Sequence, residues 1–331
     1  MARVFDLDPK TYVTHGYHRN EDCAWPETNC YVDLWIELLH GAGFEPLAAC
    51  SFFPRLDFEG EQWTFFKFDH ADLYELYGIE VLEHNIWKPM AVHAEEQTRL
   101  GRPFLVEMDG YFLPDTHGSS YRTEHVKTTV AINQIDRANR SMEYFHNKGL
   151  YRLEGDDYDG VFREGKMSPK EGEIVLPTYV EIAKFGRAKK LAPAALVTKS
   201  MELFCASYAR KPETNPITAY RARFAADMEW LLSEPAQTFH LWAFSTLRQV
   251  GANFEIGGAY LDWLSGTDQK WGEGAALSRA ISSSAKAMQF KMARAIVGKR
   301  AIDTESLLSS LENAWQALDV FLGKQLSGSH T

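Results

Sequence analysis

Cys30 is the residue whose position most directly suggests chemistry. Asn29 offers a capping side chain just before it, so Cys30 falls in the first turn of a predicted helix that ends at Gly41. The apolar residues of that helix recur at the spacing of one face: Tyr31, Leu34, Trp35, Leu38 and Leu39. N–H groups and the helix dipole at such an end stabilise a thiolate and an oxyanion. Cys30 is therefore a candidate nucleophile; the alternative is a small buried apolar side chain.

His125 is the candidate base for that thiol. It stands where a polar loop enters a predicted strand, which would hold an imidazole rigidly. A histidine that takes a proton from a thiol needs a third polar group to fix its tautomer. Asn147, just after the next predicted strand, is the first candidate for that role. The sequence leaves three other orienting groups open: Asp109, Asp136 and His146.

The first half of the chain contains the elements that must position these residues. Asp69 begins a second predicted helix, and Pro89 opens a third that ends near Gly101. Residues 104–108 form a predicted buried strand, and residues 126–132 and 142–145 a predicted hairpin around a turn at 133–140. Residues 1–170 are thus an α+β domain. Breakers between 165 and 177 predict a linker over 171–190 that contains one strand or turn.

The second half is predicted to be an all-α helical bundle over residues 191–325. Helices are expected at 191–210, 216–232, 238–264, 274–298 and 304–323. Gly251 and the Gly257-Gly258 pair are expected to kink or divide the third of these. The fold class is therefore α+β followed by an all-α domain.

Composition excludes several classes of function. The 331 residues, 45% of them hydrophobic, suffice for about two folded domains. The 45 acidic and 35 basic residues give a net charge of −10, which argues against nucleic acid as a partner. Four cysteines without CxxC spacing predict reduced thiols. With no secretory signal and no run near the roughly 18 apolar residues that cross a bilayer, a cytoplasmic protein without membrane contact is expected.

The order of Cys30, His125 and Asn147, with the cysteine opening a helix and the others beside later strands, resembles that of papain-like cysteine enzymes. Asn29-Cys30, then Asp109-Gly-Tyr-Phe-Leu-Pro114 and His125, resemble more closely the acyltransferase domain of butirosin biosynthesis, whose proteins also carry a helical C-terminal half. The chain differs from that pattern at Asn29, where a histidine is expected, and at Asn147, where an acidic residue is usual.

Over nearly its whole length the chain is also similar to an uncharacterised bacterial family of domains of unknown function. Three segments carry this similarity: Asn29-Cys-Tyr-Val-Asp-Leu-Trp-Ile-Glu-Leu-Leu-His40, Gln62-Trp-Thr-Phe-Phe-Lys67 and Tyr144-Phe-His-Asn147. Some members are encoded beside amino-acid ligases and carrier proteins. By analogy, this implies transfer of an acyl or aminoacyl group from a carrier-protein phosphopantetheine thioester to a small amine.

The resemblances imply a papain-like domain that works as a cysteine-dependent acyltransferase. His125 would take the thiol proton, Cys30 would attack the thioester, and backbone N–H groups of Asn29 and Cys30 would hold the oxyanion. No bound cofactor is expected besides the phosphopantetheine of the donor. With water as acceptor, the same site would make a thioesterase, amidase or peptidase. A non-catalytic binder of a carrier protein or ligand is the remaining alternative.

Two weaker patterns suggest binding. His15, His18 and Cys23 have a spacing that suits zinc with one more ligand, but a polar N-terminal segment explains them equally, and no metal is assigned. A basic run could meet an acidic carrier protein, or be the solvated face of the linker. Its residues are Lys184, Arg187, Lys189 and Lys190.

Overall fold

The structure is a computed structural model that describes residues 2–20, 23–25, 29–173, 178–298, 300 and 303–327. The chain divides into two compact units. The α+β unit comprises Met1–Arg19, Asn29–Pro46 and Asp69–Leu191, and the helical unit comprises Asn20–Thr28, Leu47–Phe68 and Ala192–Thr331. The predicted fold class, an α+β domain followed by a helical one, is confirmed.

An antiparallel sheet forms the centre of the α+β unit. Six strands lie in the order β2-β7-β3-β4-β5-β6, and the short β1 pairs with β4. The register aligns Leu105 with Ala131 on one side of β3 and with Glu181 on the other. The strands are β1 (Ala2–Arg3), β2 (Glu80–Glu83), β3 (Phe104–Asp109), β4 (Lys127–Asp136), β5 (Ser141–His146), β6 (Gly149–Glu154) and β7 (Val180–Lys184).

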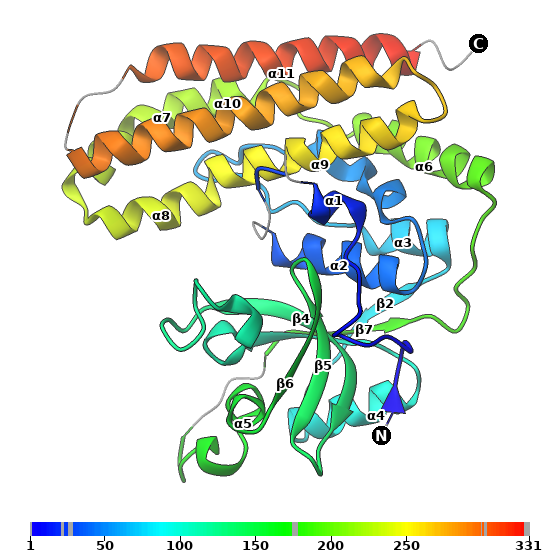
Figure 1. The fold of residues 1–331 in the computed structure, drawn as a ribbon. Helices are drawn as coiled ribbons and strands as arrows, with labels where there is room; N and C mark the ends of the chain where they lie inside the picture. Colours follow the sequence, from blue (N-terminus) through cyan, green and yellow to red (C-terminus); the bar gives the residue numbers. More distant parts are fainter. Residues whose placement is uncertain are drawn as a thin grey trace. The chain divides into compact units, whose positions relative to one another are not determined.

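Helices cover both faces of this sheet (Figure 1). On one face, α2 (Cys30–Gly41) packs on β4 and β5. It buries six apolar side chains completely, each stabilising the fold by about 2 kcal/mol: Val32, Leu34, Trp35, Ile36, Leu38 and Leu39. On the other face, α4 (Met90–Arg99) and α5 (Asp156–Phe162) share a core with β3, β4 and β5. The smaller α1 (Gly16–Arg19) and α3 (His70–Tyr77) complete the unit.

The predicted hairpin forms, but its strands are longer than expected. β4 continues to Asp136 and pairs with Ser141, with a register shift between Ile132 and Gln134. Asn133, where the turn was expected to begin, is fully buried, and its side-chain amide exchanges two hydrogen bonds with the backbone of Phe5. Asparagine favours turns, but Asn133 lies at the register shift of β4, and its side chain there forms hydrogen bonds with backbone groups of Phe5. The strand expected within the linker is β7, an inner strand of the sheet.

The helical unit is built from six long helices and the helical turns η1 (Pro46–Arg55). In Figure 1, α9, α10 and α11 lie side by side, and α10 packs against both of the others. The helices are α6 (Pro193–Tyr208), α7 (Pro216–Ser233), α8 (Ala236–Ser245), α9 (Leu247–Ser265), α10 (Trp271–Gly298) and α11 (Thr304–Ser327). No helix among the described residues is both long and apolar enough to cross a membrane.

The third predicted helix of this half is divided, but not at its glycines. The break lies at Thr246, whose φ of −124° and ψ of −93° are not helical, and α9 then continues unbroken through Gly251, Gly257 and Gly258. A Cβ at Gly251 would lie 2.2 Å from the ring of Trp25. Gly251 therefore allows the Trp25 ring to pack closely against α9, and it does not kink the helix.

The same part of α9 binds the segment that contains Trp25. Glu255 accepts hydrogen bonds from the thiol of Cys23 (3.1 Å) and from the backbone N–H groups of Ala24 (2.5 Å) and Trp25 (3.1 Å). On α10, Ser282 accepts from the Trp25 indole and Lys286 donates to the Ala24 carbonyl. Residues 23–25 are thus attached to the helical unit by polar groups of two helices.

Candidate active site

Asp109, at the end of β3, organises the polar site of the α+β unit. One carboxylate oxygen accepts from the backbone N–H of Tyr111 at 3.0 Å, and the other lies 2.6 Å from Nδ1 of His125. Gly110 follows directly and donates to the carbonyl of Val126, with no space for a Cβ because Ser120 Oγ would lie 2.8 Å away. The end of β3 and the start of β4 are thereby tied together around His125.

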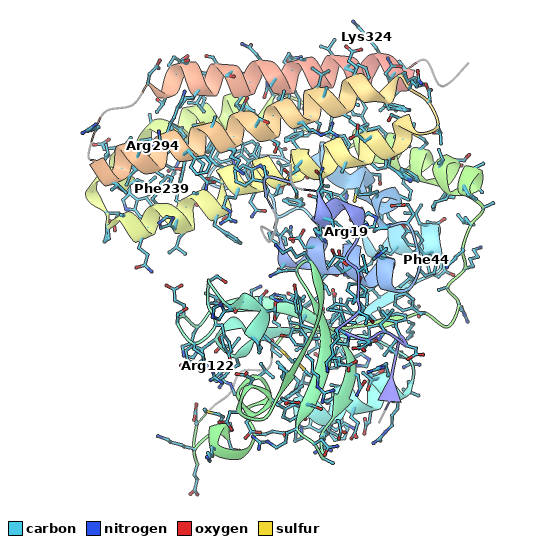
Figure 2. The ribbon with its side chains drawn as sticks, in the orientation of Figure 1. Arg19, Phe44, Arg122, Phe239, Arg294 and Lys324 are labelled. Carbon is cyan, nitrogen blue, oxygen red and sulfur yellow. The ribbon has the colours of Figure 1, made fainter. Side chains whose placement is uncertain are left out.

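Tyr111 fixes the orientation of the His125 ring plane, in addition to the contact that Asp109 makes with Nδ1. It stacks on Tyr111, with ring centroids 4.4 Å apart and planes 14° apart. An ionised carboxylate can only accept, so a neutral imidazole in this position carries its hydrogen on Nδ1 and has its lone pair on Nε2. Arg122, labelled in Figure 2, lies over the Tyr111 ring and pairs with Asp157. The side chain of His125 is 69% exposed, so its free nitrogen can meet a ligand from solvent.

A second polar network holds the loop that joins Asp109 to His125. Asp115 in this loop contacts Nδ1 of His146 and accepts from the Tyr144 hydroxyl, each at 2.5 Å. The other nitrogen of His146 lies 2.7 Å from the Thr128 hydroxyl. The His146 and Asp115 side chains are 1% and 2% exposed, so these bonds form away from water. Burial, followed by the Asp115 charge, keeps the pKa of Tyr144 well above its usual value, so it donates as a neutral phenol.

Asp109 and His125 line a cavity of about 1150 Å³ within the α+β unit. Its walls come from the segment before α4, from the facing ends of β3 and β4, and from α5 with the residues after it. A cavity of this size accommodates a small ligand. Trp87, 79% exposed, is among its lining residues.

Asn147, predicted to orient His125, lies elsewhere in the sheet. It occupies the turn between β5 and β6 with a φ of +44°, a conformation that Asn tolerates better than most residues. The pairing of β4 with β5 ends at Ala131 and Phe145, so Asn147 lies beyond the paired residues, whereas His125 precedes β4. Oδ1 of Asn147 is buried and has no hydrogen-bond partner among the residues that the structure describes. The orienting contact comes from Asp109, one of the alternatives.

The remaining orienting candidates are engaged in other contacts. Asp136 lies at the far end of β4 and binds the backbone and side chain of Asn139. Both ring nitrogens of His146 are used in the buried network with Asp115 and Thr128. Asn29 caps α2, accepting from the backbone N–H of Val32 at 3.1 Å.

Cys30 is the first residue of α2, as predicted from its sequence context. It is partly exposed and not in a disulfide. Its neighbour Tyr31 reaches across to β7, where its hydroxyl donates to Glu181 at 2.7 Å and lies 2.8 Å from Nε2 of His70. Within the described part of the chain, the Cys30 thiol makes no hydrogen bond to His125, which is held by Asp109 instead.

The N-terminal histidines form a buried electrostatic cluster on α2. His18 lies 2.5 Å from Glu37 and 3.2 Å from Asp33, and Tyr12 donates to the other Glu37 oxygen. Burial alone would lower the pKa of His18, but its bonds to these carboxylates raise it to about 9. Burial instead lowers the pKa of His15 to about 4. No group of three or more His, Cys, Asp or Glu suited to a metal occurs in the described ranges.

The basic run after β7 makes contacts within the α+β unit. Lys184 pairs with Glu80 at 2.9 Å, and Lys190 lies over the ring of Phe44. The backbone of Lys189 donates to the Tyr77 carbonyl, while its side chain and that of Arg187 are exposed. A docking role for these residues stays a prediction.

Sequence reasoning did not single out several residues of the site. Tyr111 lies in the segment used for the family resemblance, and its position between Asp109 and His125 is the feature that points to it. Trp87 and Arg163 carry no comparable sequence pattern, because they reach the cavity through packing of distant segments.

Comparison with known families covers most of the chain. Residues 14–185 match the DUF1839 N-terminal domain, and residues 193–323 match the DUF1839 C-terminal domain. No curated protein matches the sequence. The chain therefore belongs to the DUF1839 family.

Proposed function

We propose that the chain is an acyl or aminoacyl transferase that uses His125 as its base. The observation that carries this proposal is the 2.6 Å contact between His125 and Asp109 beside a ligand-sized cavity. A histidine whose Nδ1 is bound by a carboxylate presents Nε2 as a proton acceptor, which is what general-base catalysis needs. The donor, a thioester on the phosphopantetheine of a carrier protein, is proposed from the resemblance to the butirosin-type acyltransferases.

In the direct form of the reaction, the amine of the acceptor attacks the thioester carbonyl while Nε2 of His125 takes its proton. The new amide bond forms as the carbon–sulfur bond breaks, and the leaving thiolate receives the proton from His125. The acceptor amine and the thioester thus become an amide and a thiol. Asp109 stabilises the imidazolium that exists between the two proton transfers.

A covalent form passes through Cys30, and two observations support it. Cys30 opens a helix that packs on an antiparallel sheet, and His125 stands beside a strand of that sheet, as the proposed papain-like resemblance requires. In this form, the Cys30 thiol loses its proton to His125 and takes the acyl group, and the donor thiol leaves with that proton. The amine then attacks the acyl-enzyme while His125 takes its proton, and the amide bond forms as the bond between the acyl carbon and the Cys30 sulfur breaks. The Cys30 thiolate receives the proton from His125, which restores the thiol. The Cys30 thiol and the His125 ring must approach each other for these proton transfers.

Intact-mass spectrometry of the full chain with an acyl-loaded carrier protein tests the proposal. We expect an amide product with an added amine, and its loss in His125→Gln. An adduct that forms on the chain and disappears in Cys30→Ala supports the covalent form, while product formation by Cys30→Ala supports the direct one. Release of free acid alone identifies a hydrolase, and acyl transfer by His125→Gln at the unaltered rate contradicts the proposed base.

A further inference from the structure

Most charged groups that line the cavity have partners. Lys127 pairs with Glu107 at 2.7 Å, and Asp109 pairs with His125. Lys88 pairs with Glu96 and lies 4.8 Å from the ring of its neighbour Trp87. The two lysine charges are therefore compensated by carboxylates before any ligand enters, and the Asp109 carboxylate is hydrogen-bonded to His125.

Among the cations of the lining, Arg163 differs from Lys88 and Lys127. It is exposed and lines the cavity at the end of α5, and the described part of the chain gives its guanidinium neither an ion pair nor a hydrogen bond. Arginine presents a planar set of donors that matches a carboxylate or a phosphate. An unpaired arginine at a cavity is thus available to an anionic group.

The backbone at Arg163 does not account for an arginine at this position. Its φ of +53° is left-handed, and helices usually end with glycine in this conformation. A side chain there costs roughly 1 kcal/mol. The left-handed backbone alone therefore does not favour an arginine over a glycine at this position.

Two acidic residues of the lining, Glu164 and Glu173, follow Arg163 in the sequence. The charge of Glu164 adds to the effect of burial, and together they raise the pKa of Tyr158 above its usual value. Glu173 accepts from the backbone N–H of Lys170 at 3.0 Å. Neither is paired with the Arg163 guanidinium.

The rest of the lining is largely apolar. Trp87 is 79% exposed, and an exposed indole offers a flat surface on which an aromatic or aliphatic group can stack. Its apolar neighbours in the lining include Ile86, Met90, Phe112 and Met167. The cavity therefore combines an apolar wall, one uncompensated cation and the His125 base.

We infer that the cavity binds a ligand with an apolar or aromatic body and one anionic oxygen group, and that Arg163 binds the anionic group. The inference rests on the proposed function only in treating that ligand as a reactant. A carboxylate would belong to an amino-acid-like acceptor whose amine faces His125. A phosphate would belong to the donor.

Calorimetric titration of the full chain with three ligands tests this. Phenylalanine and phenethylamine share a body and an amine but differ in the carboxylate, and phenyl phosphate offers the alternative anion. We expect phenylalanine to bind 10-fold to 100-fold more tightly than phenethylamine, since a charged hydrogen-bonded pair has about that effect. Arg163→Gln should abolish the difference. Lys166→Gln, which removes a nearby exposed charge outside the cavity lining, should preserve it.

Arg163→Gly is the second variant. Glycine adopts the left-handed backbone without strain, so this variant should fold at least as well as the original chain, and a loss of binding in it cannot be caused by misfolding. Loss of the carboxylate preference in this variant supports the inference. An Arg163-dependent gain for phenyl phosphate alone assigns the anion to the donor. Equal binding of anionic and uncharged ligands, or a preference that survives Arg163→Gly, overturns the inference. Arg163-dependent binding without acyl transfer would contradict the proposed function alone.

Discussion

Asp109 contacts His125 through one carboxylate oxygen and the backbone of Tyr111 through the other. One side chain therefore fixes both the tautomer of the imidazole and the start of the segment whose aromatic ring stacks on it. The pair is partly exposed and so adds little to stability. Its consequences should appear in catalysis.

Asp109→Asn should separate these two roles. The variant keeps an oxygen for the Tyr111 N–H but places an N–H₂ donor opposite His125, which moves the imidazole hydrogen to Nε2 and removes the base. We expect acyl transfer to fall by about 10²-fold to 10⁴-fold with little change in the melting temperature. Asp136→Asn, at the other end of the strand pair, is the matched control and should retain activity. Normal transfer by Asp109→Asn would exclude an Asp-oriented base.

Tyr111 should act through its ring rather than its hydroxyl. The ring lies 4.4 Å from that of His125 and nearly parallel to it. Tyr111→Phe retains the stack and should keep most of the activity, whereas Tyr111→Leu should lose about 10-fold because the imidazole is less well oriented. Steady-state rates for the two variants, each checked for folding by circular dichroism, test this. Equal losses in both would assign the effect to the hydroxyl.

The buried network under the loop should govern stability. Thr128→Val removes the hydroxyl beside Nε2 of His146 and leaves that nitrogen unpaired in the core, at a cost of about 1 to 3 kcal/mol. Thr129→Val is the matched control, because its side chain lies on the opposite face of β4 and its hydroxyl makes no hydrogen bond to another described residue. Urea unfolding of both variants measures the difference. Similar unfolding free energies would show that the hydroxyl is not needed.

Local sequence patterns were sufficient for α2 but not for the site. The cap at Asn29 and the apolar spacing after it lie within a dozen residues, so the helix and the position of Cys30 could be predicted. The partner of His125 depends on the register of β3 and β4, which opposes Asp109 to Lys127, whereas Asn147 lies in the turn after β5. That register is set by side-chain packing between distant segments. The cavity gathers residues from segments up to ninety positions apart, which no local pattern reveals.

The two N-terminal histidines should give the α+β unit a stability maximum near pH 6.5. The folded pKa of His18, about 9, exceeds its ordinary value of 6.5, so its contribution is complete below pH 6.5 and is lost as the pH rises through 9. The folded pKa of His15, about 4, lies below 6.5, so its contribution is present above pH 6.5 and is lost as the pH falls through 4.

Unfolding free energies measured from pH 4 to 10 should therefore fall on both sides of the maximum. His15→Asn should flatten the fall between pH 6.5 and 4 while leaving the alkaline side unchanged. If the unfolding free energy falls equally below pH 6.5 in His15→Asn and in the original chain, the fall is caused by carboxylates and not by His15. Glu37 is one such carboxylate. Burial raises the pKa of Glu37, but the hydrogen bond and charge of His18 lower it by more, so the net pKa is below its usual value. The contribution of Glu37 to stability is therefore lost as the pH falls through that lowered pKa.

Glu255 should control the segment that precedes Asn29 and Cys30. Its carboxylate accepts from Cys23, Ala24 and Trp25, and these bonds hold the segment on α9. Glu255→Ala leaves two backbone N–H groups without this acceptor and should destabilise the helical unit by about 2 kcal/mol. It also removes the acceptor that Glu255 provides for the Cys23 thiol, so alkylation of Cys23 by iodoacetamide should accelerate. Cys205, whose pKa is raised by burial, provides a slow internal reference. Glu273→Gln, an exposed change in the first turn of α10, should alter neither quantity. If Cys23 reacts equally fast in the original chain and in Glu255→Ala, the carboxylate does not restrain this segment.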